Sequence, residues 1–144
     1  MSIYQKIMVA TDLSDGCMFI IDHAAGIAAQ NNAKLSVIHV APNISYYMAS
    51  GLSSIADIEL RLMEKSKQRL YAIKNKIEYV ADYILLHGNA SQEILRHSRD
   101  ANIDLIVIGS HGHRGMQRLL GSTSDNVCHC ALCDVLLVRT KISN

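Results

Sequence analysis

The chain has 144 residues and a formal net charge of +1, with 49% hydrophobic and 19% charged residues. This length fits one domain with one core over residues 1–144, and this composition excludes a chain that stays disordered. The near-neutral charge gives no electrostatic reason to expect binding to nucleic acid or to an anionic membrane. The first residues lack a signal-peptide pattern, and no apolar run approaches the roughly 18 residues of a membrane span, so we expect a soluble cytoplasmic protein.

Apolar runs and amphipathic stretches alternate from the beginning of the chain. Residues 6–10 predict a first strand. Ser14 is expected to cap a helix whose apolar face continues over residues 17–28 at helical spacing. The run 34–40, which is rich in β-branched side chains, predicts a second strand.

A long polar loop separates the second predicted strand from the longest predicted helix. Pro42, the only proline, opens this loop, which runs through about Ser53. Loops of this length in compact domains are often mobile or functional. Ser54 then resembles the start of a capping box, and an apolar stripe from Ile55 to Ile77 predicts a long helix.

The remaining segments repeat the pattern of strand and helix. Asn89 is expected to open a third helix that runs to about Ala101, and residues 122–125 are expected to cap a fourth helix. Apolar runs predict the last three strands at 83–86, 104–108 and 135–138.

Strands separated by helices predict a parallel sheet with right-handed crossovers. Strands that are apolar throughout are expected where helices cover both faces of the sheet. We therefore predict a doubly wound α/β fold, with a five-stranded parallel sheet and helices on both faces. Ligands of such sheets bind outside the carboxyl ends of the strands. Asp12, Val40, Gly88 and Gly109 lie at or just past predicted strand ends, so they could converge on one crevice.

A glycine-rich segment between the fourth strand and the fourth helix carries the strongest functional signal. Glycines let backbone N–H groups approach a phosphate closely, and a helix N-terminus adds free donors and a positive dipole. A tight connection between strand and helix also uses glycines, so the segment is a weak signal by itself. The candidate phosphate-binding residues are Gly109, Ser110, His111, Gly112, His113, Arg114, Gly121, Ser122 and Thr123.

No group in the chain has to perform catalysis. His111 and His113 resemble the histidine pair of nucleotidyl transferases, but in those enzymes the motif follows the first strand, and here it follows the fourth. Arg114 could neutralise phosphate charge, although a solvated loop residue is the simpler interpretation. The sequence has no GxSxG elbow and no P-loop lysine pattern, so slow ATP hydrolysis is the most that we expect.

The four cysteines are Cys17, Cys128, Cys130 and Cys133. Disulfide pairing is not expected in a cytosolic chain. Residues 128–133 have the look of a metal-binding tract, but Cys128 and Cys130 would lie on different faces of a helix, and no second ligand pair lies nearby. We therefore expect no metal site and interpret these cysteines as small apolar residues, and their response to oxidation stays open.

Taken together, the order and spacing of these segments resemble the universal stress protein family, of the bacterial UspA-like kind. The resemblance covers nearly the whole chain and includes residues 6–14, 33–40, 87–95, 104–112 and 121–123. The ATP-binding branch of the family carries the pattern G-x2-G-x9-G-[ST]. Gly109 and Gly112 match its first half, whereas eight residues, one fewer than the pattern has, separate Gly112 from Gly121.

The resemblance implies an adenine nucleotide as the ligand, namely ATP, with or without magnesium. Asp12 would contact the adenine or the ribose, Ala10 would line the pocket, and the backbone of Val40 would pair with the adenine edge. At the other end, Gly109 and Gly112 would let the loop wrap the ribose and phosphates. Donors to the phosphates would come from Ser122 and Thr123.

The resemblance also implies a homodimer, formed by pairing of the last strand, Val135 to Val138, with its mate. Such a module would act as a stress-response sensor or regulator. Nucleotide occupancy would order the glycine loop and the loop that begins at Pro42, and so change the surface presented to an unknown protein partner. Two alternatives stay open: a dimer that no longer binds nucleotide and works through protein partners, and a weak ATPase.

Overall fold

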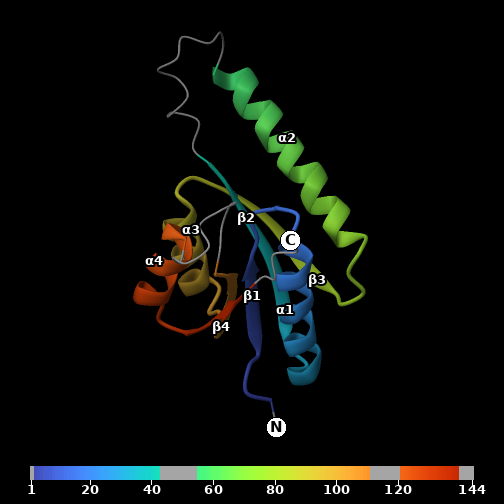
Figure 1. Ribbon diagram of the computed structural model, residues 1–144, viewed down its shortest axis with the longest axis vertical. Coiled ribbons are helices and arrows are strands. Elements are labelled where there is room, and N and C mark those ends of the chain that lie inside the picture. The colour runs from blue at the N-terminus through green and yellow to red at the C-terminus, as the bar shows by residue number, and fades with distance from the viewer. Residues whose placement is uncertain (1, 43–54, 111–120, 140–144) are drawn as a thin grey trace.

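The fold is a five-stranded parallel sheet with helices on both faces (Figure 1). The computed structural model describes residues 2–42, 55–110 and 121–139. In chain order the elements are β1 (Lys6–Ala10), α1 (Cys17–Asn31), β2 (Lys34–Ala41), α2 (Ile55–Lys74), β3 (Ala81–His87), α3 (Ala90–Asp100), β4 (Leu105–Gly109), α4 (Ser122–Cys130) and β5 (Asp134–Val138). The predicted order of strands and helices is confirmed. No helix within the described ranges is long and apolar enough to cross a membrane.

The strand order is β3-β2-β1-β4-β5, and every neighbouring pair is parallel. The first two crossovers, through α1 and α2, lead from β1 outward to β3 over one face of the sheet. The third, through α3, returns over the opposite face to β4, and α4 then leads to β5 (Figure 1). The sheet is therefore doubly wound, as predicted, and its direction of growth reverses between β1 and β4.

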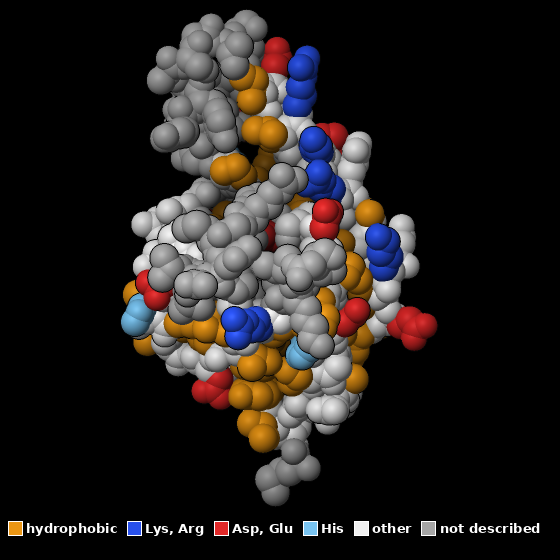
Figure 2. All heavy atoms as spheres, viewed as in Figure 1, with side chains coloured by type: hydrophobic (Ala, Val, Ile, Leu, Met, Phe, Trp, Pro, Cys, Tyr) orange, Lys and Arg blue, Asp and Glu red, His pale blue; other side chains and the backbone are white. Residues whose placement is uncertain are grey.

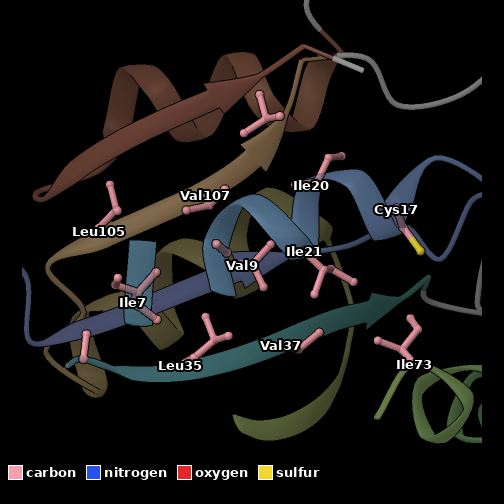
Figure 3. Close-up of a cluster of buried hydrophobic side chains, with 14 of the residues drawn as sticks. Ile7, Val9, Cys17, Ile20, Ile21, Leu35, Val37, Ile73, Leu105 and Val107 are labelled. Atoms are coloured by element: carbon pink, nitrogen blue, oxygen red, sulfur yellow. The ribbon is translucent and has the colours of Figure 1, made fainter. Parts of the chain in front are cut away.

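Hydrophobic side chains fill both faces of the sheet. On one face Ile7 and Val9 of β1 pack with Ile21 of α1 (Figure 3). On the other face the neighbouring residue Met8 packs in a second cluster with helices α3 and α4, to which Val127 belongs. Successive residues of β1 thus point into opposite cores, which explains why the strands are apolar throughout instead of alternating with polar residues.

The expected cap at Ser14 is wrong. Helix α1 begins at Cys17, its N-cap position is Gly16, and no side chain caps it. Ser14 lies earlier, where its backbone carbonyl accepts a hydrogen bond from the Cys17 N–H at 3.0 Å. The reason is a turn between the end of β1 and the helix, which occupies the residues that the pattern assigned to the first helical turn.

The other two described helix starts give a mixed result. The Asn89 side chain accepts a hydrogen bond from the Gln92 N–H at 3.1 Å, so the predicted cap of α3 is confirmed. At α4 the N-cap is Gly121 without a side-chain bond, and Ser122 is already the first helical residue, so the expected serine cap is wrong. The capping box expected at Ser54 lies outside the described residues.

The core should be most sensitive at α1, where Ile21 is fully buried. Ile21→Ala removes methyl groups from a packed site and leaves a cavity, so we expect a loss of about 2–5 kcal/mol in the free energy of unfolding. Urea denaturation measures the change. Ile3→Ala is the matched control, since Ile3 is 79% exposed and should change stability by less than about 0.5 kcal/mol. Equal effects of the two substitutions would contradict this description of the core.

Candidate functional site

Those predicted site residues that the structure describes lie at the carboxyl edge of the sheet, at or after the ends of β1, β2 and β4 or at the start of α4. Strand β1 lies between β2 and β4, and its last residue, Ala10, pairs with Ile38 on one side and with Ile108 on the other. The segments that follow β1 and β4 begin at Thr11 and at Ser110. Because β1 pairs with β4, these two segments start side by side. Because α1 and α4 lie on opposite sides of the sheet, the two segments diverge (Figure 1). Both segments therefore start at the point where the strand order reverses, which is where the crevice is expected.

A tight turn shapes the exit from β1. The Leu13 N–H donates to the Thr11 hydroxyl oxygen at 3.0 Å, and the Ser14 N–H donates to Oδ1 of Asp12 at 2.9 Å. Leu13 adopts a left-handed conformation with φ of 60°, which a branched side chain enters only when its surroundings require it. The exposed Asp12 carboxylate is therefore held through one of its oxygens.

The two ends of the glycine-rich segment are tied together. The Ser110 N–H donates to the Val138 carbonyl at 3.0 Å, and the Gly121 N–H donates to the Ser110 carbonyl at 3.3 Å. The hydroxyl of Ser110 is buried and has no hydrogen-bond partner among the residues that the structure describes. The segment between these ends, with the predicted ligands His111, Gly112, His113 and Arg114, lies outside the described residues.

Helix α4 begins at this edge with free backbone donors. Its first intrahelical bond runs from the Asp125 N–H to the Gly121 carbonyl, at 2.9 Å. The N–H groups of Ser122, Thr123 and Ser124 therefore have no intrahelical partner. Such a helix end attracts an anion through these donors and through the positive end of the helix dipole.

A cavity of about 640 Å³ opens on the β2 side of the same edge. Among the predicted site residues, Val40 lines it. Its wall also holds Glu93, whose carboxylate accepts a hydrogen bond from Arg96 at 2.7 Å. This bond holds the pKa of the Glu93 carboxyl below its usual value, and the Arg96 guanidinium that donates it balances the charge of the carboxylate. The other lining residues are Pro42, Gly88, Asn89, Ala90 and Gln92.

The cysteines lie apart from this edge, with the exception of Cys17 at the start of α1. Cys128 and Cys130 belong to α4, and Cys133 follows it before β5. All four thiols are free. The described part of the chain holds no group of three or more His, Cys, Asp or Glu side chains that could bind a metal ion.

Comparison with known proteins gives consistent matches over the whole length. A model of the universal stress protein family matches residues 3–139. The chain is 38% identical over 141 residues to universal stress protein A homolog 2 of Coxiella burnetii, a match that spans 96% of this chain and 97% of the relative.

Solved structures match the fold as well. The structure of the hypothetical protein MJ0577 superimposes with a TM-score of 0.82 at 25% identity, over 97% of this chain and 99% of that protein. A crystal structure of a universal stress protein in complex with cAMP superimposes with a TM-score of 0.64 at 26% identity, over 96% of this chain and 98% of that protein.

The thiols should differ in reactivity according to burial. Burial raises the pKa of the Cys17 thiol, and the negative charge of Asp12 raises it further, whereas Cys130 is exposed on α4. Since the thiolate is the reactive form, we expect iodoacetamide at about pH 8 to label Cys130 first and Cys17 last. Mass spectrometry over a time course measures the order, and urea-unfolded protein, in which these rates should become similar, is the control. Labelling of Cys17 as fast as Cys130 in the folded protein would contradict the structure.

Proposed function

The chain belongs to the universal stress protein family, and from that premise we propose that it binds an adenine nucleotide at the carboxyl edge of its sheet and acts as a stress-response regulator. The observation that supports the proposal is the placement of three features at the carboxyl ends of the neighbouring strands β1 and β4. These features are the Asp12 turn, the tied ends of the glycine-rich segment at Ser110 and Gly121, and the open N-terminus of α4.

Charge sets the orientation of the nucleotide. The charged group that lines the cavity beside Val40 is Glu93, which is already paired with Arg96, so this side suits the uncharged base. The N-terminus of α4 attracts phosphate, so the triphosphate of ATP would lie against Ser122 and Thr123. Asp12, between the two, would accept hydrogen bonds from the ribose hydroxyls. The match to a universal stress protein in complex with cAMP supports an adenine nucleotide as the ligand.

Magnesium would enter with the triphosphate. It binds phosphate oxygens and needs few protein ligands, which are oxygen atoms. Hydroxyl oxygens of Ser122 and Thr123 are the described groups that fit this role, because they lie in the first turn of α4. Binding of the phosphates by the protein would not depend on the ion, because the backbone donors of α4 would bind the phosphates directly.

Regulation would follow if the protein surface changes with nucleotide occupancy and a protein partner binds one form of that surface more tightly. The segments proposed to respond are the glycine loop and the loop after Pro42, and most of both lies outside the described residues. We expect this to take place in the cytoplasm, since four free cysteines suit a reducing compartment. The shortened glycine loop favours the alternative of a dimer that works without nucleotide, and release of phosphate from ATP would instead support a weak ATPase.

We also propose a homodimer through β5. This strand lies at the edge of the sheet, so one side of its backbone is unpaired. The Val138 carbonyl accepts the Ser110 N–H and therefore faces β4. Because backbone groups alternate in direction along a strand, the N–H groups of Val135 and Leu137 face outward and are available to a second copy.

An apolar groove runs beside this edge and would add buried surface to the dimer. Its volume is about 350 Å³. The Tyr4 hydroxyl donates to Asp134 at 2.8 Å at its wall. Figure 2 shows hydrophobic side chains gathered in the lower part of the visible face. The residues that line the groove are Tyr4, Ile27, Leu105, Asp134, Val135 and Leu136.

Nucleotide binding can be tested at Gly121. Its φ of −59° is open to any residue, so Gly121→Gln should fold normally but place a side chain where the phosphates would lie. We expect the affinity for ATP, measured by calorimetric titration, to fall by about tenfold or more.

Gly26→Gln is the matched control for this test. An added Cβ at Gly26, which is exposed on α1, has no heavy atom of the described residues outside its own stretch of helix within 4 Å, so affinity and stability should stay close to those of the unmodified protein. Unchanged ATP affinity in Gly121→Gln would show that the site is assigned wrongly.

The dimer can be tested at Leu137. Leu137→Pro removes an outward-facing N–H but no bond to β4, so it should convert dimers to monomers in light scattering after gel filtration. Leu137→Ala removes a similar amount of packing and keeps the N–H, so it should stay dimeric. A dimeric proline variant, or a monomeric unmodified protein, would rule out this interface.

A further inference from the structure

The hydrogen-bond ladder between β1 and β2 ends on a side chain instead of on the backbone. Its last backbone bond runs from the Thr11 N–H to the Ile38 carbonyl at 2.9 Å. In a parallel ladder the next bond would run from the Val40 N–H to the Thr11 carbonyl. Among the described residues this bond is not formed, and Nδ1 of His39 instead contacts the Thr11 carbonyl oxygen at 2.8 Å.

The contact with Thr11 determines which ring nitrogen of His39 carries a hydrogen. A carbonyl oxygen can only accept, so Nδ1 of His39 carries the hydrogen. The imidazole thus replaces the backbone N–H of Val40 as the donor to Thr11. Along a strand, the backbone groups of every second residue face the same neighbour, so the Val40 N–H points to the β1 side, like the Ile38 carbonyl. Among the described residues, the Val40 N–H therefore has no backbone partner at the carboxyl edge of the sheet.

The same contact anchors the turn that presents Asp12. Thr11 is buried, and its hydroxyl accepts the Leu13 N–H that begins the turn. The left-handed conformation of Leu13 persists only if the residues around it are held in place. His39 holds the carbonyl of Thr11, and the backbone of β2 holds its N–H, so the start of the turn is fixed on both sides.

We propose that His39 is the positioning residue of the nucleotide site. Its imidazole occupies the Thr11 carbonyl, which leaves the Val40 N–H free to donate to the adenine ring and keeps the Asp12 carboxylate in place for the ribose. The inference rests on the proposed function for the identity of the ligand. The replacement of the Val40 N–H by the His39 imidazole as donor to Thr11 exists in the ligand-free protein, so it can be tested without nucleotide.

Two substitutions separate the hydrogen bond from the bulk of the ring. His39→Asn places an amide N–H close to the position of Nδ1, so it keeps a donor to Thr11. His39→Phe keeps a ring of similar size but has no donor, so the Thr11 carbonyl becomes available to the Val40 N–H. The ladder should then extend by one backbone bond and close the base site.

Amide hydrogen exchange of the ligand-free protein measures directly whether the Val40 N–H has gained this hydrogen bond. We expect the Val40 amide to exchange about tenfold more slowly in His39→Phe than in the unmodified protein, and to stay unchanged in His39→Asn. A purely structural role for His39 predicts the opposite sign, since loss of packing speeds exchange. Unchanged or faster exchange at Val40 in His39→Phe would overturn the proposal.

Titration with ATP supplies the second readout. We expect His39→Phe to weaken binding by about tenfold and His39→Asn by less than about threefold. Val37→Ala, two residues earlier in β2, is the control for lost stability. Val37 is fully buried in the core, so this substitution should lower the melting temperature without lowering the affinity for ATP. Equal affinity in His39→Phe and the unmodified protein would overturn the proposal. An unmodified protein that binds no ATP would refute the proposed function, and the exchange experiment would then decide the role of His39 alone.

Discussion

The reversal of strand order between β1 and β4 is the constraint on which the rest of the structure depends. Crossovers in a parallel sheet are right-handed, so a chain that grows first to one side and then to the other must place its helices on opposite faces. Helices α1 and α4 consequently lie on opposite faces of the sheet although the strands that they adjoin are neighbours. Two buried clusters, one on each face, hold the sheet rigid beneath the strand ends.

The two sides of the sheet's carboxyl edge differ electrostatically. On the β2 side Glu93, whose charge Arg96 balances, lines a cavity, and on the β4 side α4 presents N–H groups without an intrahelical partner and the positive end of its dipole. A ligand with an uncharged planar end and an anionic end fits this gradient in one orientation. Adenine nucleotides have this form, which gives a physical reason, independent of the family, for the ligand proposed here.

Hydrophobic periodicity in the sequence was sufficient to predict the elements and to place Asp12, Val40 and Gly109 at or just past strand ends on one edge of the sheet. This worked because strands buried on both faces are apolar throughout, and because the chain of a parallel sheet leaves every strand at the same edge. The order of the strands was not predicted, because the hydrophobic pattern of a single segment does not indicate which strands pair with it.

Details that depend on side-chain to backbone contacts could not be predicted from pattern. Ser14 fits a helix cap by residue type, but the hydroxyl of Thr11 and the carboxylate of Asp12 stabilise a turn that delays the helix to Cys17. His39 has no distinctive spacing in the sequence, and its contact with Thr11, 28 residues away, exists only in the folded sheet.

The location of the ligand is the central claim, and chemical-shift mapping tests it most directly. Backbone amide resonances of the isotope-labelled protein would be followed by NMR during addition of ATP and magnesium. The account predicts saturable changes concentrated at Asp12, Val40, Ser110 and the first turn of α4. An absence of changes, or changes confined to the groove beside β5, would contradict it.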